Sequence, residues 1–388
     1  MEIEVQNKVI DHHQYVVAFR APSAAMIVRG GFVRINAPLA SGIVVLTVQT
    51  RYVDKGLEHP LPGDLWIDAR GPASSLEAAV SIFGNVAASI TPVIAFSTNT
   101  AIGNIEPELV YDNTPGSEAR DFLQSMVQDE RSIIHEGRTV AIDATKALLK
   151  SIEVHTEKER IIRAISQYHL ALQHWRWGHE TLATAHLFMG MEALTKAVAR
   201  VRQESSRVSE NEFAQKLGID PASLGPCDRL TPVIEANIRR TVLFQGDEEC
   251  HRSAKAASDG FEHGFMPFDE IREHARQVRD KTAKYLRKAV LDLLDIEQPY
   301  LKVLLSPPRD APLGNWPVVK YMRGQLLGLS DRLAAEGNEY PIMTWRSSIK
   351  SVEINDEGEY QLKFDENFTA RLGEGTVFQP HSFEVWRP

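Results

Sequence analysis

The chain has 388 residues, with 43 lysines and arginines against 52 aspartates and glutamates, which gives a formal net charge of −9. Hydrophobic residues make up 43% and charged residues 24%, an ordinary globular composition that excludes a disordered, collagen-like or coiled-coil chain. Two cysteines in so long a chain exclude a disulfide framework and favour a reducing compartment. The mild acidic excess argues against a surface covered with nucleic-acid contacts, although it permits one local basic groove.

The N-terminal residues do not contain a basic segment followed by an apolar core, so no signal peptide is predicted. No apolar run approaches the roughly 18 uninterrupted residues that a membrane-spanning helix needs. We therefore expect a soluble, cytoplasmic protein without a membrane partner.

Residues 1–150 are predicted to form a β-rich mixed α/β domain. Stretches rich in valine and isoleucine, separated by glycine and proline, predict strands at Tyr15–Phe19, Met26–Ile35, Ile43–Tyr52 and Leu109–Tyr111.

Two helices are predicted in the same region. Apolar residues recur at helical spacing over Ser74–Ser89, and Ser74 or Ser75 can cap the start of this helix. A second, short helix is predicted from Ser117 to about Val127, with Phe122 and Leu123 facing inward.

Residues 151–298 are predicted to form an antiparallel helical bundle. One apolar stripe comprises Ile161, Ile165, Tyr168, Leu172 and Trp175, and a second comprises Leu187, Met191, Leu194, Val198 and Val201. The short connection at Gly178 implies that these two helices pack antiparallel. A short helix near Asn211–Leu217 and a long final helix from about Phe268 to Leu294 complete the bundle.

Residues 299–339 are predicted to be a proline-containing linker with a short helix, and residues 340–388 a small C-terminal β segment. Ser348–Ile354 and Tyr360–Phe364 form a hairpin pattern around a turn at Asp356–Gly358. The predicted fold class is therefore α+β.

Familiar catalytic motifs are absent from the sequence, which contains no GxxxxGK[ST], GxGxxG, HExxH, GxSxG or CxxC pattern. His169, His174, His179 and His186 are five, five and seven residues apart, whereas metal-binding pairs on a helix prefer a spacing of three or four. Neither a metal nor a cofactor is predicted. Cys250 is expected to be a small apolar filler rather than a nucleophile.

The strongest local signal is the segment from Arg252 to Gly264, which is predicted to be a helix followed by a sharp turn. Asp259, Glu262 and His263 lie within five positions, so titratable groups are concentrated at one point. This arrangement suits acid–base chemistry at His263 or a polar lock that fixes the angle between two helices. Gly260 and Gly264 allow positive φ on either side of the pair Glu262-His263.

Three pieces of the helical region carry a family resemblance. The segments Ala164–Ala171 (AISQYHLA) and Phe188–Leu194 (FMGMEAL) are similar to two signature helices of the HEPN superfamily, and Phe261–Gly264 (FEHG) resembles the HG that closes its signature. The region resembles the Apea-like branch most closely, over about a third of the chain.

The resemblance implies a four-to-five-helix bundle, often a symmetric homodimer. It also implies, for many members, metal-independent ribonuclease activity through an R-x4-6-H motif, with the His as general acid/base and the Arg on the phosphate. His263 matches the motif's His and Asp259 the polar residue that follows the Arg. Ser258 stands at the Arg position, and Arg252 lies eleven residues before His263. Arg252, Arg239 or Arg240 would then have to supply the cation.

Further cations are candidates for binding an RNA backbone: Arg239, Arg240, Arg272, Arg276 and Arg279, with Arg287 on the same predicted side of the last helix. The alternative is a solvated face, because acidic residues interleave with these arginines. Glu192, predicted near the inward face of its helix, requires a partner, for which Arg239, Arg240 and His263 are the candidates.

Two functional hypotheses follow. The first is an RNA-directed HEPN-like protein of a prokaryotic stress or defence system, acting as a metal-independent ribonuclease with His263 as acid/base, Asp259 orienting it and Arg252 or Arg240 on the phosphate. The second is a catalytically inactive bundle used for dimerisation or partner binding. In both, the N-terminal domain is the expected surface for a protein partner.

Overall fold

The computed structural model describes residues 13–53, 60–115, 121–124, 137–176, 178–225, 229–264, 266–314, 319–327, 334–337, 342–354 and 360–386. The chain divides into two compact units. The first comprises Met1–Arg51, Gly63–Ser132 and Gly137–Asn315, and the second comprises Tyr52–Pro62, Ile133–Glu136 and Trp316–Pro388. The fold is α+β, as predicted.

A six-stranded sheet in the order β3-β4-β5-β1-β6-β7 forms one part of the first unit. Strand β1 lies inside the sheet and pairs antiparallel with both β5 and β6. The strands are β1 (His13–Ala21), β3 (Val33–Leu39), β4 (Gly42–Val53), β5 (Leu61–Ala73), β6 (Glu106–Asp112) and β7 (Phe122–Gln124). Two short strands, β2 (Ala25–Met26) and β8 (Arg138–Thr139), pair in parallel beside it.

Most predicted strands lie inside observed strands, but one predicted strand is observed as two separate strands. The predicted strand Met26–Ile35 is wrong as a single element, because β2 ends at Met26 and β3 begins at Val33. Gly30, at φ 83°, lies in the turn between them, a conformation that glycine adopts without strain.

The predicted helix from Ser117 to Val127 is also wrong where the structure describes it. Residues 122–124 form the edge strand β7, and Phe122 and Leu123 are 63% and 54% exposed rather than inward-facing. The parts of this prediction at 117–120 and 125–127 lie outside the described residues.

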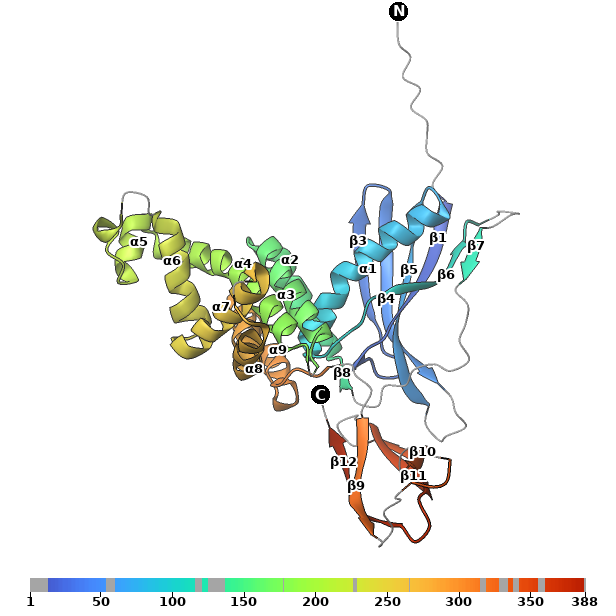
Figure 1. Ribbon diagram of the computed structural model, residues 1–388. Helices are drawn as coiled ribbons and strands as arrows, with labels where there is room; N and C mark the ends of the chain where they lie inside the picture. Colours follow the sequence, from blue (N-terminus) through green and yellow to red (C-terminus); the bar gives the residue numbers. More distant parts are fainter. Residues whose placement is uncertain are drawn as a thin grey trace, which may run out of the picture. The chain divides into compact units, whose positions relative to one another are not determined.

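Helix α1 (Leu76–Thr98) covers one face of the sheet (Figure 1). Ser75 caps it, as predicted, by accepting a hydrogen bond from the Ala78 amide at 3.2 Å. The helix continues past the predicted end at Ser89 and through Pro92 to Thr98. It is long and apolar enough to cross a membrane, but half of its most apolar window is buried, which favours the core helix of a soluble protein.

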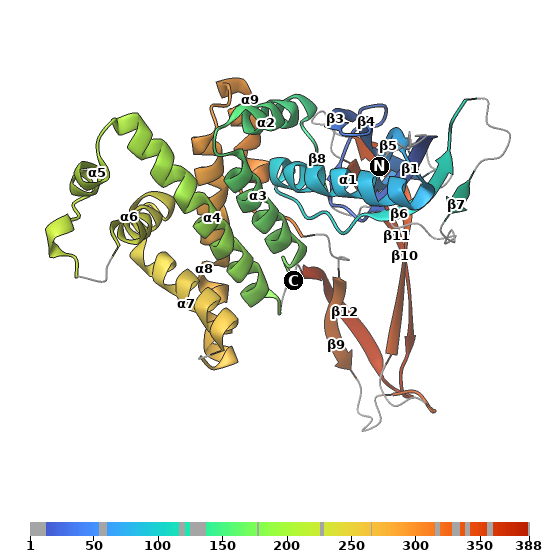
Figure 2. The same cartoon turned by 90° about the horizontal axis from the view of Figure 1, so that it is seen from above.

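Further helices extend the first unit beyond α1 (Figure 2). Helices α3 and α4 pack antiparallel, as predicted, and α7 and α8 pack on α4 and on each other. The helices are α2 (Ile142–Val154), α3 (Lys158–Gln173), α4 (Glu180–Ser206), α5 (Glu210–Lys216), α6 (Leu230–Ile238), α7 (Glu248–His263), α8 (Phe268–Leu293) and α9 (Gln298–Leu304). A π-helical turn, Arg239–Leu243, follows α6.

Gly260 and Gly264 were both predicted to allow positive φ, and for Gly260 this prediction is wrong. Gly260 lies inside α7, and a Cβ there would approach Ile271 Cγ1 to 3.0 Å, so this glycine allows close helix packing and does not adopt positive φ. Gly264, at φ 65°, ends α7 in the left-handed conformation, as predicted.

A buried polar junction joins the end of α1 to the helices. Asn99 is fully buried at φ 54°, and its Nδ2 donates to the Arg309 carbonyl at 2.7 Å. The Tyr168 hydroxyl donates to Asn99 Oδ1 at 2.7 Å. Burial raises the pKa of Tyr168, so this hydroxyl stays protonated and acts as a donor.

The Tyr168→Phe variant should be less stable by about 1–3 kcal/mol, because Asn99 Oδ1 would lose its donor while remaining buried. Chemical denaturation measures this difference. Tyr300→Phe, at a partly buried position in α9, is the matched control and should change stability by less than about 0.5 kcal/mol. Equal stability of the two variants would contradict the assigned role of this hydrogen bond.

The second unit contains two antiparallel strand pairs. β10 (Ile342–Ile354) pairs with β11 (Tyr360–Arg371), which confirms the predicted hairpin, and β9 (Val319–Leu327) pairs with β12 (Val377–Trp386). The predicted turn at Asp356–Gly358 lies outside the described residues.

Candidate functional site

The face of α7 that carries Arg252, Asp259 and His263 is the candidate site. These residues are separated by seven and four positions, so at about 100° per residue they lie within about 40° of one another around the helix axis. Arg252 and His263 are exposed and Asp259 is half-buried. We refer to these three residues as the α7 face.

The start and end of α7 fix the position of this face. Asp247 caps the helix by accepting a hydrogen bond from the Cys250 amide at 3.0 Å, and this bond is the main reason why the pKa of Asp247 is lowered. His263 is the last helical residue, directly before Gly264. The imidazole therefore lies at the C-terminal end of the helix.

Two carboxylates in this segment have close partners within α7. Asp259 forms an ion pair with Lys255 one turn earlier. Glu262 accepts a hydrogen bond from the Ser258 hydroxyl at 2.9 Å. The predicted concentration of titratable groups is present, and Lys255 adds a cation that the sequence reasoning did not single out.

Ser258 occupies the position where the HEPN motif has its arginine, and only 1% of it is exposed. A side chain at this depth does not reach solvent. Arg252, about 16 Å from His263 along the helix at 1.5 Å per residue, cannot contact the same phosphate as His263 within one chain.

Arg239 and Arg240 lie in the π-helical turn and are paired with acids. Arg239 forms an ion pair with Glu192 at 3.1 Å, which confirms one of the three predicted partners, and also donates to Thr195 Oγ1 at 3.2 Å. The expectation that Glu192 is buried is wrong, because its side chain is 48% exposed. Arg240 pairs with Glu248 at 3.1 Å.

The structure places His251 close to these two arginines, which sequence reasoning missed. Its ring packs 5.2 Å from that of Phe244, and burial, followed by Arg239, lowers the pKa of His251. Sequence reasoning missed this contact because the eleven residues between Arg239 and His251 include a π-helical turn and a loop, whose geometry helical periodicity does not describe.

The predicted arginines of α8 have several different surroundings. Arg272 lies 5.1 Å over the Phe268 ring and Arg279 lies 4.3 Å over the Trp175 ring. Arg279 also pairs with Asp280 at 3.0 Å, and Arg276 lies 3.9 Å from each of two glutamates, Glu180 and Glu273. These acidic partners favour the solvated-face alternative over a basic groove.

Arg287 was predicted on the same side of α8 as these arginines, and this is wrong because only 4% of it is exposed. It donates to the carbonyl oxygens of Phe96, Ser97 and Leu304 at 3.4, 3.5 and 2.7 Å. Arg287 therefore belongs to the junction at the end of α1 and is not available to a ligand.

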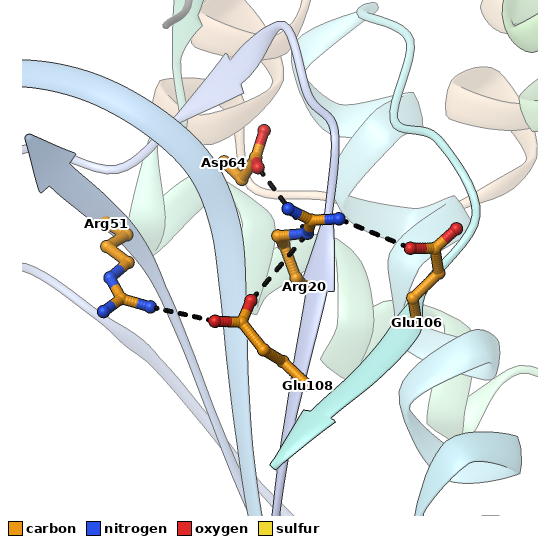
Figure 3. Close-up of polar contacts among 5 residues, drawn as sticks. All are labelled: Arg20, Arg51, Asp64, Glu106 and Glu108. Atoms are coloured by element: carbon orange, nitrogen blue, oxygen red, sulfur yellow. Dashed lines mark hydrogen bonds and ion pairs between the residues drawn. The ribbon is translucent and has the colours of Figure 1, made fainter. Parts of the chain in front are cut away.

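A second charged cluster lies on the sheet (Figure 3). Arg20 of β1 lies 3.8 Å from Asp64, 3.4 Å from Glu106 and 3.8 Å from Glu108, and Arg51 lies 3.5 Å from Glu108. The five side chains come from four strands, so this network links neighbouring strands of the sheet. Both guanidinium groups are paired with carboxylates, which suits a structural role.

Cys250 is buried, and its Sγ lies 3.6 Å from Thr282 Oγ1. Burial raises the pKa of this thiol, which opposes formation of the nucleophilic thiolate. The prediction of an apolar filler agrees with this environment. Within the described ranges, no three histidine, cysteine, aspartate or glutamate side chains are grouped so as to hold a metal ion.

The buried side chain of His169 should make the stability of the fold depend on pH. Burial lowers its pKa to about 4, and its Nδ1 has no hydrogen-bond partner among the residues the structure describes. The unfolded state, with a pKa near 6.5, binds this proton first, so the contribution of His169 to stability should be lost as pH falls from about 6.5 towards 4.

The loss should be of the order of 2–3 kcal/mol and should be measurable by urea unfolding at pH 7 and pH 4.5. His169→Gln should flatten this part of the pH profile, although the other histidines with lowered pKa values retain a smaller dependence of the same sign. An unchanged slope in His169→Gln would contradict the prediction.

No family model, curated protein or solved structure matches this chain. The resemblance to the HEPN superfamily therefore stays a prediction based on the sequence motifs.

Proposed function

We propose that this chain is an HEPN-like, RNA-directed protein of a prokaryotic stress or defence system, which acts in the cytoplasm and cleaves RNA without a metal ion. The observation that carries this proposal is the α7 face, on which Arg252, Asp259 and His263 lie together and the first and last of these are exposed. The family resemblance supplies the chemistry expected of such a face.

The proposed site is completed by a second copy of the chain. A two-fold axis across the middle of α7 would place two α7 helices antiparallel and bring Arg252 of one protomer to the partner's His263. The same axis generates a second, identical site. This arrangement overcomes the separation of about 16 Å between the two residues along one helix.

Each group has a stated role in this site. His263 acts as the general acid/base, because imidazole exchanges protons near neutral pH. Arg252 of the other protomer binds the phosphate through its guanidinium group, which can donate two parallel hydrogen bonds. Asp259, one turn before His263, orients the imidazole, and Lys255 pairs with Asp259 on the same face.

The second candidate function is the catalytically inactive scaffold, and a specific observation favours it. Ser258 at the motif's arginine position is buried, and the neighbouring tip of the α7–α8 hairpin exposes Phe261 (41%) and Phe268 (53%). Exposed aromatic residues of this kind are common at protein interfaces. In this alternative the bundle dimerises or binds a protein partner without cleaving RNA.

Incubation of the purified full-length chain with labelled single-stranded RNA in EDTA separates the two functions. The proposal predicts cleavage by a protein that is dimeric by size-exclusion chromatography with light scattering. A dimer that binds RNA or protein but leaves the RNA intact would support the scaffold and overturn the ribonuclease proposal.

A further inference from the structure

The connection between α3 and α4 brings three histidines together. His174 Nδ1 lies 3.3 Å from His179 Nδ1, and the two rings stack with centroids 5.6 Å apart. The His186 ring lies parallel to that of His174, with an interplanar angle of 2° and centroids 5.7 Å apart. All three side chains are half-buried. We call them the histidine cluster.

The distance between the two Nδ1 atoms matches that of a shared metal ion. Two imidazole nitrogens bound to Zn²⁺ at about 2.0–2.1 Å with tetrahedral angles lie about 3.3–3.4 Å apart. The spacing of five along the chain does not oppose such a site, because His174 ends α3 whereas His179 precedes α4. The rule of three or four positions applies only to two ligands on one helix.

The third histidine of the cluster is held by a hydrogen bond to α3. His186 Nδ1 lies 2.9 Å from Gln167 Oε1, and because an amide oxygen only accepts, Nδ1 carries the proton and Nε2 keeps its lone pair. This hydrogen bond fixes the orientation of the His186 ring beside His174.

The electrostatic surroundings favour the neutral form of the histidines. Burial lowers the pKa values of His174, His179 and His186, and Arg176 lowers the first two further, whereas Glu180 raises that of His179. Neutral imidazole is the form that binds a metal.

A buried carboxylate oxygen lies in the residue next to His179. Glu180 is 4% exposed, and its Oε2 has no hydrogen-bond partner among the described residues. Its other oxygen, Oε1, lies 3.9 Å from Arg276 Nε, so Oε2 is the carboxylate oxygen left to attract a further cation.

We propose that His174 and His179 bind a divalent transition-metal ion of the zinc, nickel or copper class. Imidazole is a preferred ligand for these metals. Since the described side chains do not include three that converge on one point, solvent completes the coordination, and His186 keeps its hydrogen bond to Gln167 beside His174. The ion would cross-link α3 to α4 at their connection, on residues that the proposed ribonuclease site does not use.

Calorimetric titration of the tag-free, EDTA-treated full-length chain with ZnCl₂ tests this proposal. Wild type should take up a single saturable equivalent, and His174→Ala and His179→Ala should each abolish it. Gln167→Leu should leave the uptake unchanged, because His186 and its acceptor lie outside the proposed coordination. His274→Ala, at a histidine of α8 outside the cluster, is the matched control and should bind like wild type.

Thermal unfolding supplies a second readout and checks that each variant folds. Zn²⁺ should raise the melting temperature of wild type and of His274→Ala but not of His174→Ala or His179→Ala. The absence of saturable uptake by wild type, or the same uptake by folded His174→Ala and His179→Ala variants, would overturn the proposal.

Discussion

Replacing His263 with alanine should slow RNA cleavage in EDTA by about 10²–10⁴-fold, the usual contribution of a general acid or base. His263 lies exposed at the end of α7, so the substitution removes the proton-transfer group without creating a cavity in the core. Initial rates with end-labelled single-stranded RNA measure the effect.

His274→Ala provides the control for this experiment. His274 lies on α8 and is not part of the α7 face. Its replacement should leave both the cleavage rate and the dimer unchanged. A His263→Ala protein that remains dimeric and cleaves RNA at the wild-type rate would contradict the assigned role of this imidazole.

Replacing Arg287 with alanine should lower the free energy of unfolding by about 3–5 kcal/mol, because it leaves buried carbonyl groups without donors and opens a cavity. The guanidinium group donates to three carbonyl oxygens, two at the end of α1 and one in α9. It also lies 5.5 Å over the Phe96 ring. The negative end of the α1 dipole favours a cation at this point, which offsets part of the cost of burying the charge.

Lys288→Ala is the matched control for Arg287→Ala. Lys288 is the next residue of α8, exposed and paired with Asp292 at 2.6 Å, and the loss of such a surface pair should cost less than about 1 kcal/mol. Urea denaturation of the two variants compares them directly. Similar stabilities would contradict the role assigned to Arg287 in the junction.

The long helices were predictable because each buries one apolar stripe. The periodicity identified the buried stripes of α3 and α4 and gave nearly correct bounds for α8, and Ser75 marked the start of α1. Strand β5 was missed because Pro62 and Gly63 open it and charged residues alternate with its buried ones, so the apolar pattern that identifies a strand is interrupted.

The residues of the α7 face could be placed from the sequence, because helical geometry alone puts Arg252 and His263 on one side of one helix. Contacts between segments that are far apart in the sequence could not be predicted in this way. The burial of Arg287 depends on carbonyl groups 191 positions earlier, and the contact of His174 with His179 depends on how the chain turns between two helices. Hydrophobic periodicity describes a single helix or strand and carries no information on contacts between distant segments.

The most direct test of the central claim is a mixing experiment with two variants, His263→Ala and Arg252→Ala. Each alone should be inactive, since every site in its homodimer lacks one group. After subunit exchange, half of the dimers should be mixed and each should contain one intact site, so the mixture should recover about a quarter of wild-type cleavage. Recovery of this size supports a site shared between protomers, whereas a mixture as inactive as its components, with subunit exchange confirmed, would contradict it.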